Sequence, residues 1–185
     1  MKSLKKITYI IITLLVALTL QNCERDDICA ETTATTPQIV IEFYDASDPE
    51  DLKSVPNFTL FGEGLATNPT ATTDATILFN DIANAIKLPL KIGAEGDVTT
   101  TRFVLEKDTD LRLDDDAATN SNIDVIEISY TTEFVYVSRA CGYKSNFTNL
   151  EVTAEAGVDL AWIDSIEMIE TEIKNENTVH VHIFH

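Results

Sequence analysis

Three cysteines carry the clearest chemistry in this sequence, and the first of them, Cys23, follows a segment that predicts export. A basic start, with Lys at positions 2, 5 and 6, precedes an apolar run from Ile7 to Leu20. This run is shorter than the about 20 apolar residues that a membrane-spanning helix needs. Its positive flank lies on the N-terminal side only, which is typical of a secretory signal peptide.

The residues that end this region, Leu20-Gln21-Asn22-Cys23, are similar to a bacterial lipobox, in which a signal peptidase cuts before a diacylated cysteine. Asn22 departs from the pattern, because a small residue usually precedes the cysteine. We predict a lipoprotein signal peptide over residues 1–22 and lipidation of Cys23. The alternatives are an ordinary signal peptide cut at another bond and an uncleaved anchor. Several acyl chains anchor a protein stably, since each buried methylene contributes about 0.8 kcal/mol.

Cys29 and Cys141 are the two cysteines that remain. Export places them in an oxidising compartment, where an even pair in a secreted domain most often forms a disulfide. We predict that they pair; the alternative is two buried free thiols. Cys29 is six residues from Cys23, and that stretch reaches at most ~20 Å at about 3.3 Å per residue. A disulfide would then hold the domain close to the membrane, with its Cys141 end facing inward.

Two histidines near the C-terminus form the first weak candidate for a metal site. His180 and His182 are two residues apart on an expected strand, so both rings would project from one face, as metal ligands can. His185 falls on the opposite parity, and no Cys or carboxylate stands nearby at an evident ligand spacing. An exposed terminal strand is therefore the favoured interpretation.

An acidic loop forms the second weak candidate. Asp114 and Asp116 lie in a stretch that also contains Asp108, Asp110 and Asp115, and carboxylate oxygens bind hard cations such as calcium. The stretch lacks the alternating spacing and the glycine of an EF-hand loop. A solvated loop is favoured, and we predict no resident metal and no cofactor.

The sequence contains no evident arrangement for catalysis, which for a nucleophilic enzyme requires a nucleophile, a base and an orienting group within hydrogen-bond reach. All three histidines lie in the last six residues, and among 31 acidic residues any pairing of carboxylates for glycoside cleavage is arbitrary. Gly62-Glu63-Gly64 lacks the third glycine of a dinucleotide site. Trp162 and the tyrosines are assigned to the core and its rim rather than to a carbohydrate platform. We predict that the protein is not an enzyme.

The charge of the chain excludes one class of partner. Removal of residues 1–22 leaves ten Lys and Arg against 31 Asp and Glu, a net charge of −21. Such a surface repels nucleic acid, whose binding needs Lys and Arg to replace phosphate counterions. It also repels anionic lipid headgroups, so the lipid rather than charge must hold the protein at its membrane. The apolar content of 44% argues against disorder.

From residue 38 onward the pattern is that of short strands with little helix. We predict strands at 38–44, 57–61, 76–79, 88–92, 99–106, 123–137 (two strands or one bent strand), 146–153 and 178–184, with a helical turn in 80–87. About seven to nine such strands favour an all-β fold, an antiparallel β-sandwich of immunoglobulin-like or Greek-key type. Residues 23–37 form a short acidic and polar tether, and residues 38–185 form a single sandwich domain. In 162–173 isoleucines recur near helical spacing, but we predict a strand, since Ile favours strands.

Several segments resemble an uncharacterised lipoprotein family of Bacteroidota, domain of unknown function 6452. The resemblance is carried by the motifs Cys23-Glu24-Arg25-Asp26-Asp27-Ile28-Cys29, Thr35-Thr36-Pro37, Ile41-Glu42-Phe43-Tyr44-Asp45, Tyr136-Val137-Ser138-Arg139-Ala140-Cys141-Gly142-Tyr143-Lys144, Asn175-Glu176-Asn177 and His180-Val181-His182-Ile183-Phe184. It supports lipidation of Cys23 and pairing of Cys29 with Cys141, but it implies no activity. It also implies an outer-membrane β-barrel protein as a partner. The acidic residues directly behind Cys23 resemble the signal that sends lipoproteins of these bacteria to the cell surface, which we favour over the periplasmic face of the outer membrane.

Two classes of function follow from these expectations. The first is a non-catalytic structural or accessory lipoprotein that is anchored to the outer membrane by its N-terminal lipid and docks to an outer-membrane protein. The second is a ligand-binding surface module for a glycan, a peptide or a cation, which needs an aromatic or carboxylate cluster on one exposed face.

Overall fold

The protein is described here by a computed structural model that covers residue 6 and residues 28–33, 35–114, 116, 119–158 and 160–185. The chain divides into two compact units. The smaller unit consists of residues 1–33 and 137–142, and the larger unit consists of residues 34–136 and 143–185. Among the described residues, no helix has the length and apolar character needed to span a membrane.

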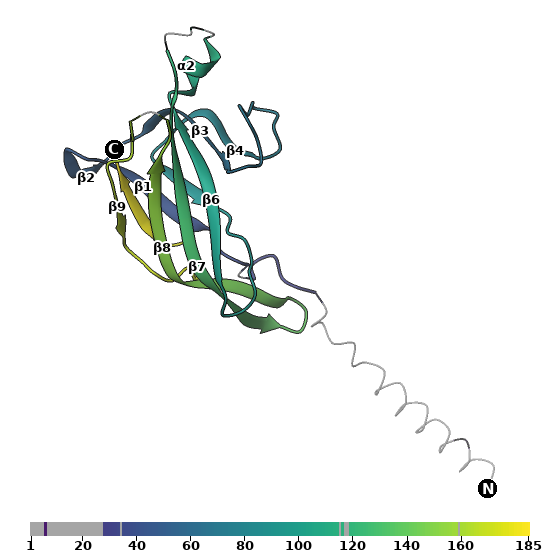
Figure 1. Ribbon diagram of the computed structural model, residues 1–185. Coiled ribbons are helices and arrows are strands. Elements are labelled where there is room, and N and C mark those ends of the chain that lie inside the picture. The colour runs from purple at the N-terminus through teal and green to yellow at the C-terminus, as the bar shows by residue number, and fades with distance from the viewer. Residues whose placement is uncertain (1–5, 7–27, 34, 115, 117–118, 159) are drawn as a thin grey trace. The chain divides into compact units, whose positions relative to one another are not determined.

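The first sheet of the larger unit joins the two ends of the domain sequence. Its strand order is β2 (Asp48–Leu52), β1 (Ile39–Asp45), β10 (Val181–Phe184) and β9 (Ser165–Met168), and β5 (Ala85–Leu88) also pairs with β1. The β1–β10 pair is parallel, with Ile41 opposite Val181, whereas β1 pairs with β2 and β5 in antiparallel fashion. Strand β10 therefore lies inside the sheet, between β1 and β9 (Figure 1).

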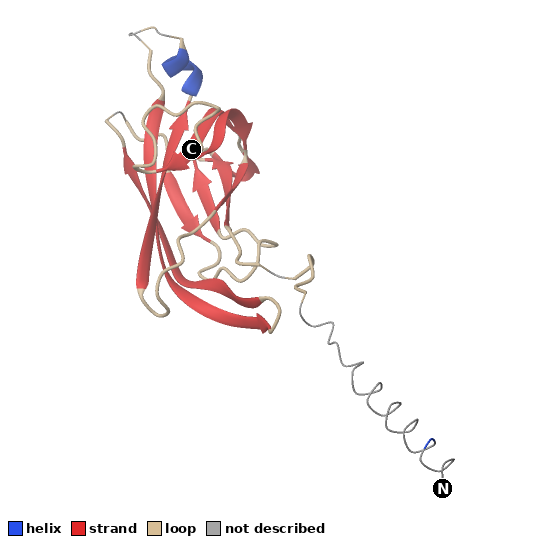
Figure 2. Ribbon diagram, turned by 90° about the vertical axis from the view of Figure 1, so that its right-hand side faces the viewer, coloured by secondary structure: helices blue, strands red, loops and turns tan. Residues whose placement is uncertain are grey.

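The second sheet is built from strands that are mostly neighbours in sequence. Its order is β4 (Thr76–Ala83), β3 (Val55–Gly62), β6 (Val98–Lys107), β7 (Asn122–Ser138) and β8 (Gly142–Ala156). The β3–β4, β3–β6 and β6–β7 pairs are antiparallel. From residue 28 onward the described residues thus form ten strands in two sheets and one short helix, α2 (Thr109–Leu113). In Figure 2 the helix lies at one end of the strands. The predicted all-β sandwich is confirmed, with more strands than the predicted seven to nine and with one parallel pair.

One hydrophobic core lies between the two sheets. Alternate residues of β1 (Ile39, Ile41, Phe43) and of β7 (Ile126, Ile128, Tyr130) are buried, which is the period-two pattern of strands that cover a core with one face. Aromatic rings fill the space between them: Phe43 packs edge-on against Phe58 with ring centroids 5.6 Å apart. The assignment of Trp162 to the core is confirmed, since it is 8% exposed and packs against both of these rings.

The chain crosses from the second sheet to the first at residues 162–164. The backbone N–H groups of Trp162 and Ile163 both donate to Oδ2 of Asp124 on β7, at 2.9 and 2.8 Å. The indole N–H of Trp162 donates to the carbonyl of Leu105 on β6, while the N–H of Asp164 donates to the carbonyl of Phe184 on β10. Three consecutive residues therefore bind both sheets, and Asp124, which is fully buried, accepts two of these bonds.

Several strand boundaries differ from those that the sequence predicts. The helical turn predicted in 80–87 is wrong, because β4 extends to Ala83 and β5 covers Ala85–Leu88. The strand predicted at 88–92 is also wrong beyond Leu88, where Pro89 ends the pairing. Strand β2 was not predicted, because all of its residues are exposed and it has no alternating pattern. Residues 123–137 lie in one long strand, β7. Of the strand predicted at 162–173, only β9 (Ser165–Met168) is a strand, and the described residues of that range contain no helix.

Candidate functional site

The disulfide between Cys29 and Cys141 is the most distinctive chemical feature of the smaller unit, and it has the predicted pairing. The two Cα atoms are 4.9 Å apart, and the bond closes a loop across a sequence separation of 112 residues. Cys141 lies in the short connection between β7 and β8. The disulfide therefore joins the N-terminal segment covalently to a hairpin of the second sheet.

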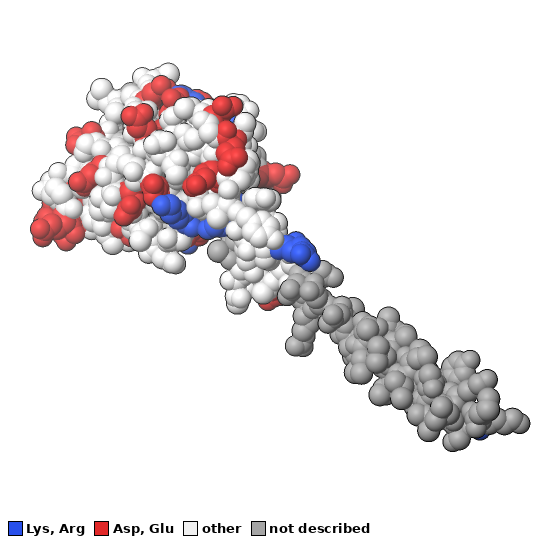
Figure 3. All heavy atoms as spheres, turned by 90° about the horizontal axis from the view of Figure 1, so that it is seen from below, with Lys and Arg blue, Asp and Glu red and all other residues white. Residues whose placement is uncertain are grey.

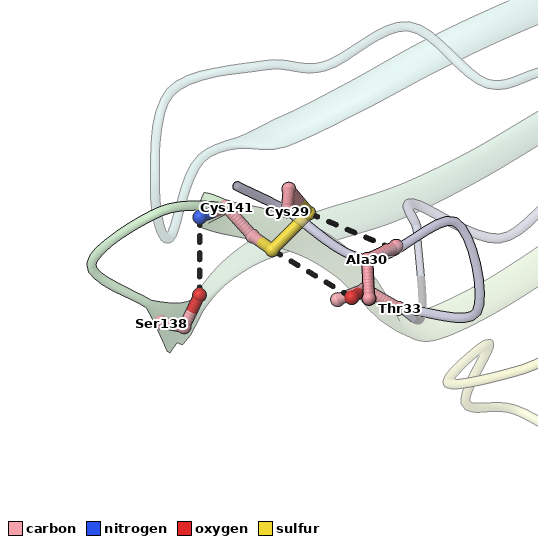
Figure 4. Close-up of a disulfide and its surroundings, with 5 residues drawn as sticks. All are labelled: Cys29, Ala30, Thr33, Ser138 and Cys141. Atoms are coloured by element: carbon pink, nitrogen blue, oxygen red, sulfur yellow. Dashed lines mark hydrogen bonds between the residues drawn. A yellow bond between two sulfur atoms is a disulfide. The ribbon is translucent and has the colours of Figure 1, made fainter. Parts of the chain in front are cut away.

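Short-range contacts support the disulfide from both sides (Figure 4). The N–H of Cys141 donates to the hydroxyl of Ser138 at 3.0 Å, and the hydroxyl of Thr33 lies 3.7 Å from Cys141 Sγ. A turn shapes the N-terminal side, since the N–H of Thr33 donates to the carbonyl of Ala30 at 2.9 Å. Cys23 lies outside the described residues, so its lipidation stays a prediction.

His180 and His182, the weak candidates for metal ligands, each contact different protein groups. His180 is buried, and its Nδ1 accepts the N–H of Val40 at 3.0 Å. The ring of His182 lies against Tyr44, with centroids 4.4 Å apart, and its Nδ1 is 3.7 Å from Oε2 of Glu167. The favoured interpretation of an exposed terminal strand is wrong, because parallel pairing with β1 places β10 inside its sheet.

Asp114 and Asp116, the other weak candidates for metal ligands, lie where α2 ends. Asp114 is the C-cap residue of α2, and its Oδ1 accepts the N–H of Asp116 at 2.8 Å. Both carboxylate oxygens of Asp114 also accept from the hydroxyl of Thr119. These bonds shape the loop itself. Within the described parts of the chain, no three His, Cys, Asp or Glu side chains are grouped so that they could hold a metal ion.

Burial of the C-terminal histidines makes the stability of the sandwich depend on pH. Desolvation lowers the pKa of His180 and of His185 below the ordinary value of 6.5. The unfolded chain therefore binds these protons at a higher pH than the folded chain does. Below about pH 6.5 the unfolded state holds more protons, so stability is lost as the pH falls through this range.

We expect the melting temperature to fall as the pH is lowered from about 7.5 to about 5.5, and to fall less in a His180→Gln variant. Thermal unfolding followed by circular dichroism over this range measures both slopes. Glu155 and Glu176 have a pKa below the ordinary 4.5, owing to hydrogen bonds from Arg102 and Lys87, so their contribution is lost only in more acidic solution. An equal slope in wild type and His180→Gln would contradict the expectation.

A groove on the second sheet is the best candidate for binding a small ligand. It has a volume of about 550 Å³ and lies along β3, β4, β6 and the segment that follows β5. Its apolar lining includes Leu65, Ile77, Pro89, Leu90 and Phe103. Sequence reasoning did not find this groove, because its residues come from four segments that are separated in the chain.

Arg102, one of the charged residues that line this groove, is already engaged by carboxylates. Arg102 pairs with Glu155 at 2.6 Å and with Glu63 and Glu127 at 2.5 Å. Hydrogen bonds to these three carboxylates raise the pKa of Arg102 above its ordinary value. The guanidinium is thus occupied by protein groups, and the groove offers mainly an apolar surface to a ligand.

Acidic residues are dispersed over the surface. Figure 3 shows Asp and Glu side chains at many separate places on the visible face of the described residues, with few Lys and Arg among them. The acidic excess of the sequence is therefore a general property of this face and does not mark one binding cluster.

Comparison with known proteins adds a family but no activity. Residues 64–185, about two thirds of the chain, match a family whose description is "Family of unknown function (DUF6452)". The matched region contains Cys141 and the motif around it, whereas Cys23 and Cys29 precede it. No curated protein and no solved structure matches the chain.

Proposed function

The chain belongs to the family of unknown function DUF6452, and because that membership carries no activity, we propose a function from the chain's own residues. The protein is a lipoprotein of the outer membrane and serves as a non-catalytic accessory partner of an outer-membrane protein. The observation that carries this proposal is the disulfide between Cys29 and Cys141. It lies six residues after Cys23, the predicted lipidation site.

A short covalent path supports the role as an anchored partner. Six residues reach at most ~20 Å at about 3.3 Å per residue, and the disulfide then transfers this constraint to the hairpin of β7 and β8. A short tether raises the effective concentration of a domain at a partner in the same membrane, so binding needs only a modest contact surface. A disulfide also agrees with an exported location, because such bonds persist in oxidising compartments.

The location is tested with the full chain expressed in its native host. Wild-type protein should fractionate with the outer membrane and carry a diacylglyceryl group by intact mass, and Cys23→Ala should abolish both properties. Protease treatment of whole cells distinguishes the two leaflets, and digestion without permeabilisation supports the cell surface. A wild-type protein without acylation would overturn the anchoring.

The partner is tested by purification from membranes in mild detergent. The epitope belongs in the loop after α2, because the C-terminal His185 is bonded through its N–H to Tyr44 and through its carbonyl to Lys53. Stoichiometric recovery of one β-barrel protein with wild type, and its loss with Cys23→Ala, is the expected result. Isolation of the acylated protein alone would contradict an accessory role.

The groove favours a second candidate, a ligand-binding module. An apolar hollow of about 550 Å³ is large enough for a small organic molecule or an apolar side chain of a peptide. A small organic molecule or an apolar peptide that raises the melting temperature of wild type, but not of a Leu65→Asp variant, would support this function. Leu65 suits the test because it lines the groove and is 71% exposed, so the substitution leaves the core intact.

A further inference from the structure

Strands β7 and β8 continue beyond the sheet that supports them. The pairing of β6 with β7 ends at Val98 opposite Thr131, with an isolated bridge from Glu95 to Thr132. β7 extends to Ser138, and its remaining partner in the sheet is β8. At the end of this hairpin, every second side chain of β7 therefore lies on the same face as the core residues of the second sheet.

Aromatic residues occupy that face. The buried residues Ile126, Ile128 and Tyr130 alternate along β7, and the same alternation leads to Phe134 and Tyr136, which are 39% and 58% exposed. On β8, Tyr143 is 67% exposed and lies two residues before the buried Ser145.

The two tyrosines are in contact, with ring centroids 5.4 Å apart in an edge-on arrangement. We call Phe134, Tyr136 and Tyr143 the aromatic face. On sequence alone, all the tyrosines are assigned to the core and its rim, whereas Tyr136 and Tyr143 are exposed on this face.

The chemistry of this face suits the interface of a membrane. Tyrosine combines an apolar ring with a hydroxyl group and is enriched where hydrocarbon meets the headgroups. Exposed aromatic groups gathered at one place mark a contact surface more often than isolated apolar residues do. The net charge of −21 on the exported chain opposes attraction to anionic headgroups, and we assign the contact to these rings.

The covalent path from the predicted lipid leads to the same place. Tyr143 is two residues from Cys141, which is bonded to Cys29, six residues from Cys23. At about 3.3 Å per residue these segments and the disulfide limit the separation of Cys23 and Tyr143 to roughly 30 Å. A bilayer that holds the lipid is thus within reach of the aromatic face.

We propose that the aromatic face of Phe134, Tyr136 and Tyr143 inserts into the interfacial region of the bilayer that holds the lipid of Cys23. This inference rests on the proposed anchoring. The contact adds a second attachment to the lipid and restricts the orientation of the sandwich, so that a partner in the same membrane meets a defined surface.

Fluorescence quenching tests the insertion with the full, acylated chain in phosphatidylcholine vesicles that carry brominated acyl chains. The reporter variant is Tyr143→Trp, and Ile82→Trp is the matched control, since Ile82 is 69% exposed on β4. We expect the brominated lipid to remove about half of the added indole fluorescence in Tyr143→Trp and little in Ile82→Trp. The native Trp162 is buried and contributes a constant background.

Intact mass of the same samples separates the two proposals. Acylated protein with equal quenching in both variants overturns the insertion and leaves the anchoring in place, whereas protein without acylation overturns both. Quenching that falls steeply with added salt also contradicts the proposal, because it would indicate attraction by charge. Cross-linking between copies through the aromatic face would assign it to self-association and overturn insertion as well.

Discussion

Replacing Cys29 and Cys141 together with Ser should lower the free energy of unfolding by about 4–5 kcal/mol, since the disulfide closes a loop of more than 100 residues in the unfolded chain. The sequence separation of 112 residues encloses most of the sandwich. Without the bond, the unfolded state regains the conformational freedom of that loop, and the folded state keeps its core. Urea unfolding followed by the fluorescence of Trp162, the single tryptophan, measures the change.

Reduction of the wild type provides the matched control for this prediction. Wild type in reductant should unfold at the same urea concentration as the double variant, and reductant should leave the double variant unchanged. The single variants Cys29→Ser and Cys141→Ser should each lose as much as the double variant, because one bond is removed in every case. A wild type whose stability does not change on reduction would contradict the prediction.

Replacing Asp124 with Ala should destabilise the sandwich by about 3–5 kcal/mol, because it leaves two buried N–H groups without a protein partner. The side chain of Asp124 is fully buried, and its Oδ2 accepts the N–H groups of Trp162 and Ile163. These residues form the crossing between the sheets. Loss of the acceptor therefore weakens the connection of β7 to the segment that leads to β9, and urea unfolding measures it.

An Asp124→Asn variant separates the role of the acceptor from that of the side chain's volume. Asn keeps an oxygen where Oδ2 lies, so it should retain both bonds and lose only about 1–2 kcal/mol. Near-ultraviolet circular dichroism of the Trp162 band should change in Asp124→Ala and persist in Asp124→Asn. Equal stability of the two variants would show that the hydrogen bonds to Trp162 and Ile163 contribute little.

The strands that could be predicted are those with one buried face. In β7 every second side chain from Asp124 to Thr132 is buried, and in β1 Ile39, Ile41 and Phe43 are buried together with Val40. The period-two pattern of apolar residues therefore predicts the strands, although it does not predict each buried residue. Strand β2 is exposed along its whole length and has no such pattern. The position of β10 inside its sheet could not be predicted either, because its partner β1 lies at the other end of the domain sequence.

The candidate sites divide in the same way. The pairing of Cys29 with Cys141 could be inferred from the number of cysteines and from their context, because covalent chemistry depends on residue type. The partners of His180, His182 and Asp114 could not be inferred, since they depend on which distant strand or loop lies beside each ring or carboxylate. The aromatic face was missed because Phe134 and Tyr136 continue the alternation of buried residues, and only the end of β6 pairing leaves them uncovered.

By itself, the sequence determined the fold class, the acidic character and the pairing of its two downstream cysteines, because these follow from local periodicity, composition and residue chemistry. The tertiary structure alone decided the parallel β1–β10 pair, the crossing at Asp124, the groove beside Arg102 and the exposure of the aromatic face. The physical reason is that each of these features depends on contacts between segments far apart in the chain, and such contacts leave no periodic signal in either segment.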